Sequence, residues 1–145
     1  MTPTEIIIHH SLTKDSGTVN WGAIRKYHTD PKPVGMGMTS IGYHLGIELV
    51  QSGDNLYYES LMGRVWDAEG GHTIGHNDKS LGICFIGNYD EEDPTEQMLI
   101  TGAKVIRLWM RLFNIQRDSI FPHRDFADKT CPGTKFDMNV LKDLI

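Results

Sequence analysis

Two histidines and one cysteine stand where this chain could build a metal site. His9 follows the β-branched run Ile6–Ile8, and His123 follows the short apolar segment 120–122. Cys131 comes eight residues after His123. Imidazole nitrogen and thiolate sulfur suit Zn²⁺, which prefers four ligands. Three protein ligands would leave one position for water, as catalytic zinc sites do.

Each of these residues also has a plainer interpretation. A histidine at a strand end is more often structural than a ligand, and a lone cysteine is more often an inert buried thiol. Spacing alone therefore leaves His9, His123 and Cys131 as plausible ligands among seven histidines and two cysteines. The chain has no paired Cys-x-x-Cys segments of the kind that hold structural zinc. A metal site here is thus expected to be open.

Several short motifs carry more information together than any single residue. They are Ile-Ile-Ile-His-His-Ser at 6–11, Ile-Gly-Tyr-His at 41–44, Gly-His with a later Asn and Ser-Leu-Gly-Ile within 71–83, and Lys-Thr-Cys-Pro at 129–132. In this order and spacing they resemble the zinc-dependent N-acetylmuramoyl-L-alanine amidases. That family includes small phage endolysins and the animal peptidoglycan recognition proteins. The resemblance extends from Glu5 to Pro132.

The resemblance implies a metal centre with a catalytic pair beside it. His9, His123 and Cys131 match the family's zinc ligands. Tyr43 matches the tyrosine of the family's Gly-Tyr-His motif, and Lys129 matches a lysine two residues before the ligand cysteine. Non-catalytic relatives often lose metal ligands, so the complete set favours an enzyme with one Zn²⁺ per chain.

The implied activity is hydrolysis of the amide bond between N-acetylmuramic acid and L-alanine in bacterial peptidoglycan, by a phage or prophage endolysin. Zinc lowers the pKa of its bound water to about 7, which makes hydroxide available for attack on the lactyl carbonyl. Lys129 is expected to stabilise the oxyanion. Tyr43 is expected to orient the water, to donate to the oxyanion or to protonate the leaving amine. A non-catalytic peptidoglycan-recognition module is the alternative.

The remaining histidines carry weaker indications of function. His72 lies in a glycine-rich loop similar to one in the family, and we expect it either to line the substrate groove or to be a plain loop residue. His10 is expected to be structural, because neighbouring strand residues point to opposite faces of a sheet. The same reasoning makes His44 either a packed residue or one that supports a ligand from behind. His28 and His76 are expected at the surface.

Strands are expected to bring these residues together. The apolar runs 6–8 and 81–86 have the composition of central strands that are buried on both faces. Residues 43–50 and 56–58 are expected to pair as a hairpin across a Gly-Asp-Asn turn. Residues 120–121 are expected to form a short strand that ends at Pro-His.

Three helices and a turn complete the expected elements. Asn20 is expected to cap a short helix, and Asp93 is expected to be the N-cap of the longest helix, with proline and glutamate at its first and third positions. Residues 137–144 are expected to form a last short helix. Residues 15–17, Asp-Ser-Gly, are a turn signal.

The alternation of strands and helices predicts an α/β fold with a central mixed sheet flanked by helices. The 145 residues are the usual size of one domain and can bury a real core. We therefore expect a single catalytic amidase domain over 1–145, without a separate wall-binding domain. The strand order is not predicted.

Composition limits the partners that we expect. The formal net charge is −5, whereas nucleic-acid binding calls for a basic surface. No apolar run reaches the length of a membrane span, and the N-terminus lacks the features of a signal peptide. We expect a monomer that is made in the cytoplasm and acts on peptidoglycan in the periplasm after release. A regulatory protein partner stays open.

Overall fold

A five-stranded mixed β-sheet organises the chain, in the order β3-β2-β4-β1-β5. Its strands are β1 (Glu5–His10), β2 (Leu45–Ser52), β3 (Asn55–Met62), β4 (Ser80–Phe85) and β5 (Ile120–Pro122). β1 is parallel to β4 and β5, and β2 is parallel to β4. β3 returns antiparallel to β2 at one edge. The predicted hairpin, the two interior strands and the mixed α/β class are confirmed.

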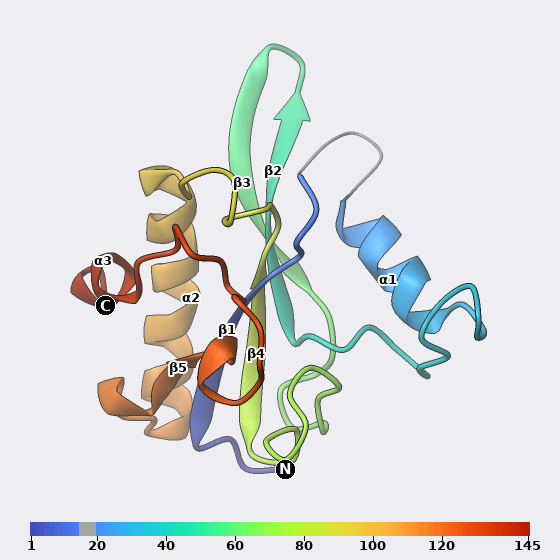
Figure 1. Cartoon of the computed structure of the whole chain (residues 1–145). Helices are drawn as coiled ribbons and strands as arrows, with labels where there is room; N and C mark the ends of the chain where they lie inside the picture. The colour runs from blue at the N-terminus through green and yellow to red at the C-terminus, as the bar shows by residue number, and fades with distance from the viewer. Residues whose placement is uncertain (15–19) are drawn as a thin grey trace.

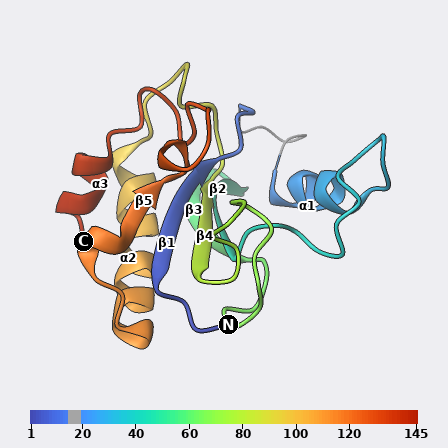
Figure 2. The same ribbon diagram turned by 60° about the horizontal axis from the view of Figure 1, so that its bottom comes forward.

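Three helices cover the two faces of this sheet. They are α1 (Trp21–Thr29), α2 (Glu96–Phe113) and α3 (Met138–Asp143). α2 and α3 lie on one face and α1 lies on the other (Figures 1 and 2). The computed structural model describes residues 1–14 and 20–145, and the predicted turn at 15–17 lies outside the described residues. No helix of the described residues has both the length and the apolar character that a membrane crossing requires.

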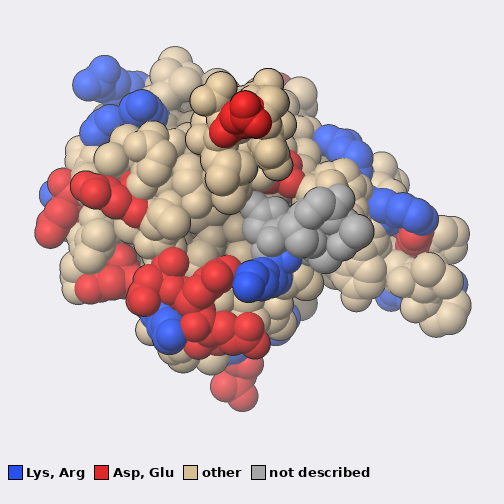
Figure 3. Space-filling model, turned by 90° about the horizontal axis from the view of Figure 1, so that it is seen from above, with Lys and Arg blue, Asp and Glu red and all other residues tan. Residues whose placement is uncertain are grey.

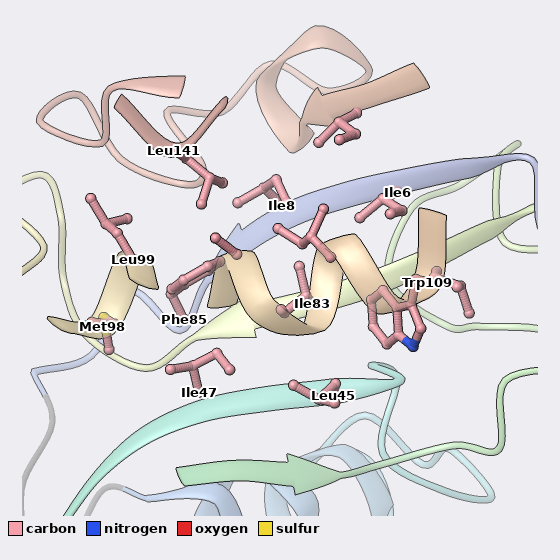
Figure 4. Packing of buried hydrophobic residues seen from close by; sticks show 14 of the residues in the cluster. Ile6, Ile8, Leu45, Ile47, Ile83, Phe85, Met98, Leu99, Trp109 and Leu141 are labelled. Carbon is pink, nitrogen blue, oxygen red and sulfur yellow. The ribbon is translucent and has the colours of Figure 1, made fainter. Parts of the chain in front are cut away.

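The main hydrophobic core fills the space between α2, α3 and the sheet (Figure 4). Ile6 and Ile8 of β1 belong to this core and are fully buried. Because successive strand residues alternate in direction, His9 points to the opposite face. Its partner on β4, Cys84, packs there in a second, smaller cluster with Trp21. The alternation of β1 thus separates the core from the site.

The helix starts follow local capping chemistry. The side chain of Asn20 accepts a hydrogen bond from the backbone N of Ala23 at 3.0 Å, so the predicted cap of α1 is confirmed. The predicted cap of α2 at Asp93 is wrong, because Thr95 is the N-cap. The Thr95 hydroxyl accepts from the backbone N of Met98 at 3.2 Å and donates to the Tyr58 hydroxyl at 2.8 Å. This second hydrogen bond connects the start of α2 to β3. It is a tertiary contact, which local helix propensity cannot predict.

Candidate metal centre

The ends of two adjacent parallel strands bring His9 and His123 together. His9 lies near the end of β1, and His123 follows β5 directly. Their ring centroids are 4.4 Å apart. The loop after His123 then returns Cys131 to the same place, where its Sγ lies 3.8 Å from Nδ1 of His9. One ligand atom from each of the three residues lies within 4.8 Å of the others.

The three residues fit a zinc ion in distance and in donor type. A tetrahedral zinc with a Zn–S bond of about 2.3 Å and a Zn–N bond of about 2.0 Å places those nitrogen and sulfur atoms roughly 3.5 Å apart. The 3.8 Å between Nδ1 of His9 and Sγ of Cys131 is close to that separation. Two imidazoles and one thiolate also form the borderline-soft donor set that zinc prefers.

Burial controls the protonation of the three residues. Burial, with a smaller contribution from His72, holds the pKa of His9 well below its usual value, and burial also lowers the pKa of His123. Both imidazoles are therefore neutral at pH 7, which is the form that binds metals. Burial raises the pKa of the Cys131 thiol to about 11. Without a metal, Cys131 is a protonated thiol at pH 7.

Arg124 fixes the loop that carries Cys131. The backbone N of Arg124 donates to the carbonyl of Cys131 at 2.7 Å. Its guanidinium donates to the carbonyls of Gly133 at 2.9 Å, Thr130 at 3.4 Å and Phe136 at 3.4 Å. Sequence reasoning missed Arg124, although its position directly after His123 was a signal that could have found it.

Asp90 is a second anchor of the same loop. Its carboxylate accepts from the Thr130 hydroxyl and from the backbone N of Thr134, both at 2.8 Å. Asp90 was not predicted either, because it lies 40 residues before Thr130 in the chain. The two ends of the Cys131 loop are thus held by charged side chains from different segments.

Tyr43 and Lys129 line the same cavity as the three candidate ligands. The cavity has a volume of ≈ 780 Å³, within the usual range for small-ligand sites. The Tyr43 ring centroid lies 5.1 Å from that of His9, and burial raises the pKa of Tyr43 well above its usual value. Lys129 is exposed at the rim, and its positive charge contributes to the lowered pKa of His123. Residues of α1 such as Ile24 and Tyr27 form the opposite wall.

Three of the remaining histidines are structural. His10 is buried, and its Nδ1 accepts from the backbone N of Tyr89 at 3.2 Å. His44 is fully buried, and its Nδ1 accepts from the backbone N of Gly82 at 3.0 Å. His28 was expected at the surface, and this prediction is wrong. Only 8% of His28 is exposed, and its Nδ1 accepts from a backbone N–H of the loop before β2 at 2.9 Å.

The last two histidines belong to one loop but have different surroundings. Nδ1 of His72 lies 3.0 Å from Nε2 of His9 and 3.0 Å from the Thr73 hydroxyl. His72 also lines the cavity. His76 is half-buried rather than on the surface, with its Nδ1 2.7 Å from a carboxylate oxygen of Glu5. Of these two histidines, only His72 is close to the candidate metal centre.

Charge is unevenly spread around the molecule. In the view from above, Asp and Glu side chains gather along one side of the face, and Lys and Arg form separate groups (Figure 3). Together with the net charge of −5, this distribution does not favour a polyanionic ligand on this face.

Comparisons with known proteins agree on one family. A family model described as N-acetylmuramoyl-L-alanine amidase matches residues 1–134. A peptidoglycan recognition protein of Trichoplusia ni is 30% identical over 137 residues, which cover 90% of this chain and 69% of that protein. An endolysin of Klebsiella phage KP32 is 28% identical over 138 residues, covering 93% and 82% of the two chains.

The fold has the same relatives. The solved structure of the N-acetylmuramoyl-L-alanine amidase LysC from Clostridium intestinale URNW superposes with a TM-score of 0.80 at 26% sequence identity, covering 99% of this chain and 85% of that chain. The family model spans nearly all of the present sequence. The chain therefore belongs to the N-acetylmuramoyl-L-alanine amidase family.

Proposed function

We propose that this protein is a zinc-dependent amidase that hydrolyses the bond between N-acetylmuramic acid and L-alanine in peptidoglycan. The observation that carries the proposal is the convergence of His9, His123 and Cys131 within 4.8 Å of one another. They line a cavity that also contains Tyr43 and Lys129. Similarity to a phage endolysin and to LysC supports a role in breaking down the bacterial cell wall.

In this proposal the three ligands would hold one Zn²⁺ and leave a position for water. When bound, zinc would supply hydroxide near neutral pH and polarise the carbonyl of the scissile amide. A set of three protein ligands is the arrangement of catalytic rather than structural zinc sites. Loss of His123 or Cys131 is therefore expected to remove both the metal and the activity.

The other two residues of the site, Lys129 and Tyr43, have different roles because they differ in exposure to solvent. The Lys129 ammonium stands at the rim of the cavity, where it meets the negative charge that develops on the amide oxygen. Tyr43 keeps its proton at neutral pH, because burial raises its pKa. As a neutral phenol, Tyr43 orients water or donates a hydrogen bond, and it does not act as a phenolate base.

A digestion of purified peptidoglycan tests the proposal. The protein is incubated with peptidoglycan, with and without a strong chelator, and the new chain ends are identified by mass spectrometry. We expect new L-alanine amines and unmodified muramic acid carboxyls, and we expect the chelator to prevent their formation. Cut sugar chains with intact amides would refute the proposal. Binding without new ends would favour the recognition module.

A matched pair of variants tests the metal ligands. His123→Ala is expected to abolish activity and zinc binding together. His76→Ala is the control, because His76 is half-buried but pairs with Glu5 rather than with the metal centre. Activity of His123→Ala at the wild-type rate would overturn the zinc assignment.

A further inference from the structure

His72 lies behind His9, on the side of the ring that does not face Cys131. Nδ1 of His9 is 3.8 Å from Sγ of Cys131, whereas Nε2 of His9 is 3.0 Å from Nδ1 of His72. We propose that His72 is a positioning residue that accepts a hydrogen bond from Nε2–H of His9 and keeps Nδ1 of that ring turned toward the metal. This inference rests on the zinc site of the proposed function.

The proton positions follow from the metal site. A neutral imidazole that binds a metal through Nδ1 carries its one proton on Nε2. Nε2 of His9 is therefore the donor, and Nδ1 of His72 is the acceptor. His72 then carries its own proton on Nε2, which is buried and has no hydrogen-bond partner of ordinary geometry among the described residues.

The surroundings of His72 hold its ring in one place. A Cβ atom on Gly82 would lie 2.5 Å from Cδ2 of His72, and a Cβ atom on Gly70 would lie 2.6 Å from the same atom. The two glycines thus leave space for the imidazole and for little else. The side-chain oxygen of Asn77 accepts from the backbone N of both His72 and Thr73 at 2.8 Å. The packing therefore fixes the ring of His72, and these hydrogen bonds fix the backbone of its loop.

The same contacts argue against a polar contact between His72 and a substrate. Nδ1 of His72 is engaged by His9 and by the Thr73 hydroxyl. Nε2 of His72 is buried. Although the residue lines the cavity, neither ring nitrogen is available to a ligand there. We therefore assign the polar contact of its Nδ1 to His9 and not to a substrate.

A neutral imidazole is an unusual choice for this task. Metal-binding histidines usually donate their second N–H to a carboxylate, a backbone carbonyl or water, and loss of such a partner typically weakens metal binding about 10- to 100-fold. The Thr73 hydroxyl, 3.4 Å from Nε2 of His9, is a second and more distant acceptor. Removal of both groups is therefore expected to have the largest effect.

Two nearly isosteric variants separate the acceptor from the volume of the side chain. His72→Asn places an amide oxygen near the position of Nδ1, whereas His72→Leu has the same number of side-chain heavy atoms and no acceptor. Zinc affinity is measured by competition with a chromophoric chelator, and the cobalt-substituted proteins are compared by their visible spectra. Circular dichroism of the metal-free proteins shows whether each variant is folded.

We expect His72→Leu to bind zinc about 10- to 100-fold more weakly than the wild type, with a changed cobalt spectrum. His72→Asn should stay within a few-fold of the wild type, and adding Thr73→Val to His72→Leu should weaken binding further. His76→Asn is the matched control in the same loop. Unchanged zinc affinity in folded His72→Leu, with a raised KM, would overturn the proposal in favour of a substrate contact. Equal losses in His72→Leu and His72→Asn would also overturn it.

Long-range proton–nitrogen NMR spectra of the zinc-loaded wild type give a test that needs no variant. We expect His9 to carry its proton on Nε2 and His72 to carry its proton on Nε2. A proton on Nδ1 of His9 would overturn the proposal. A wild-type protein that binds no zinc would overturn the metal centre itself, whereas zinc binding without amidase activity would leave the role of His72 intact and contradict the proposed function alone.

Discussion

At the scale of single residues, some side chains that line the cavity are buried and fixed by their neighbours, whereas others are exposed and can contact a substrate. His9 is 1% exposed and in contact with His72, whereas Lys129 is exposed at the rim. The Lys129 ammonium forms none of the ion pairs between described residues. Its charge is thus free to stabilise an oxyanion.

Lys129→Ala is expected to reduce kcat by about a hundredfold or more while zinc stays bound, since loss of one oxyanion donor typically costs that much. Amide hydrolysis and zinc content are measured on the same samples. Lys26→Ala, in the exposed ion pair of α1 with Asp30, is the control and should match the wild type. Loss of zinc together with activity would show that Lys129 supports the metal site instead.

Zinc binding is expected to release at least one proton per ion near pH 7, one from Cys131 and a further fraction from water on the ion, whose pKa falls to about 7. The pKa of Cys131 is raised to about 11, so the thiol must lose its proton to become a ligand. His9 and His123 have lowered pKa values and are already neutral, so they release none. Calorimetry in buffers of different ionisation enthalpy measures this number. Zinc affinity should also rise by about tenfold or more per pH unit around pH 7. Zero protons released would contradict the assignment of Cys131 as a ligand.

At the scale of elements, the site depends on a loop that both charged side chains and the backbone of β1 hold in place. β1 and β5 fix the positions of His9 and His123 through backbone pairing. Cys131 lies in a loop with no strand of its own, and Arg124 and Asp90 supply its anchors. The position of the thiol therefore depends on these two charged residues together with the backbone N of His10, which donates to Sγ of Cys131 at 3.4 Å.

Arg124→Met is expected to lower the free energy of unfolding by about 1–3 kcal/mol, because it removes the donors to three backbone carbonyls. It should also weaken zinc binding, since the Cys131 loop loosens. Urea denaturation and chelator competition measure the two effects. Arg117→Met is the matched control, as its exposed pair with Asp143 is worth at most about 1 kcal/mol. Equal stability losses in both variants would refute the anchoring role of Arg124.

At the scale of the whole molecule, the fold keeps most of its histidines neutral. Burial is the first cause of a lowered pKa in each of six: His9, His10, His28, His44, His72 and His123. In the unfolded chain a histidine has a pKa of about 6.5. Below that pH the unfolded state binds protons that the native state does not, so acid favours unfolding.

The metal-free protein is therefore expected to lose stability between pH 7 and pH 5. Each histidine that is protonated only in the unfolded state contributes a loss of about 1.4 kcal/mol per pH unit, until the pH reaches its native pKa. For His72 that native pKa is about 3. Urea midpoints at pH 7, 6 and 5 in the presence of a chelator measure the slope. This window lies above the usual carboxylate pKa values, and a constant midpoint across it would contradict the prediction.

The sequence by itself determined the interior strands, and its motifs predicted the candidate ligand set. The apolar run Ile6–Ile8 is typical of a strand that is buried on both faces of a sheet. Because side chains alternate along such a strand, His9 and His10 point to opposite faces. Motif order then singled out Tyr43 and Lys129, and the structure places both in the cavity with the three candidate ligands. These inferences depend on local pattern and order, which the chain carries along its own length.

The tertiary structure alone decided the contacts between distant segments. The cap of α2 moved to Thr95, where the hydroxyl meets Tyr58 of β3. Only the structure shows that His28 is buried and that Arg124 and Asp90 anchor the Cys131 loop. The contact of His72 with His9 joins residues 63 positions apart. Such pairs depend on strand order and on the packing of loops, and neither leaves a periodic trace in the sequence. The sequence thus predicted the candidate zinc ligands, whereas the groups that contact and anchor them could be identified only from the fold.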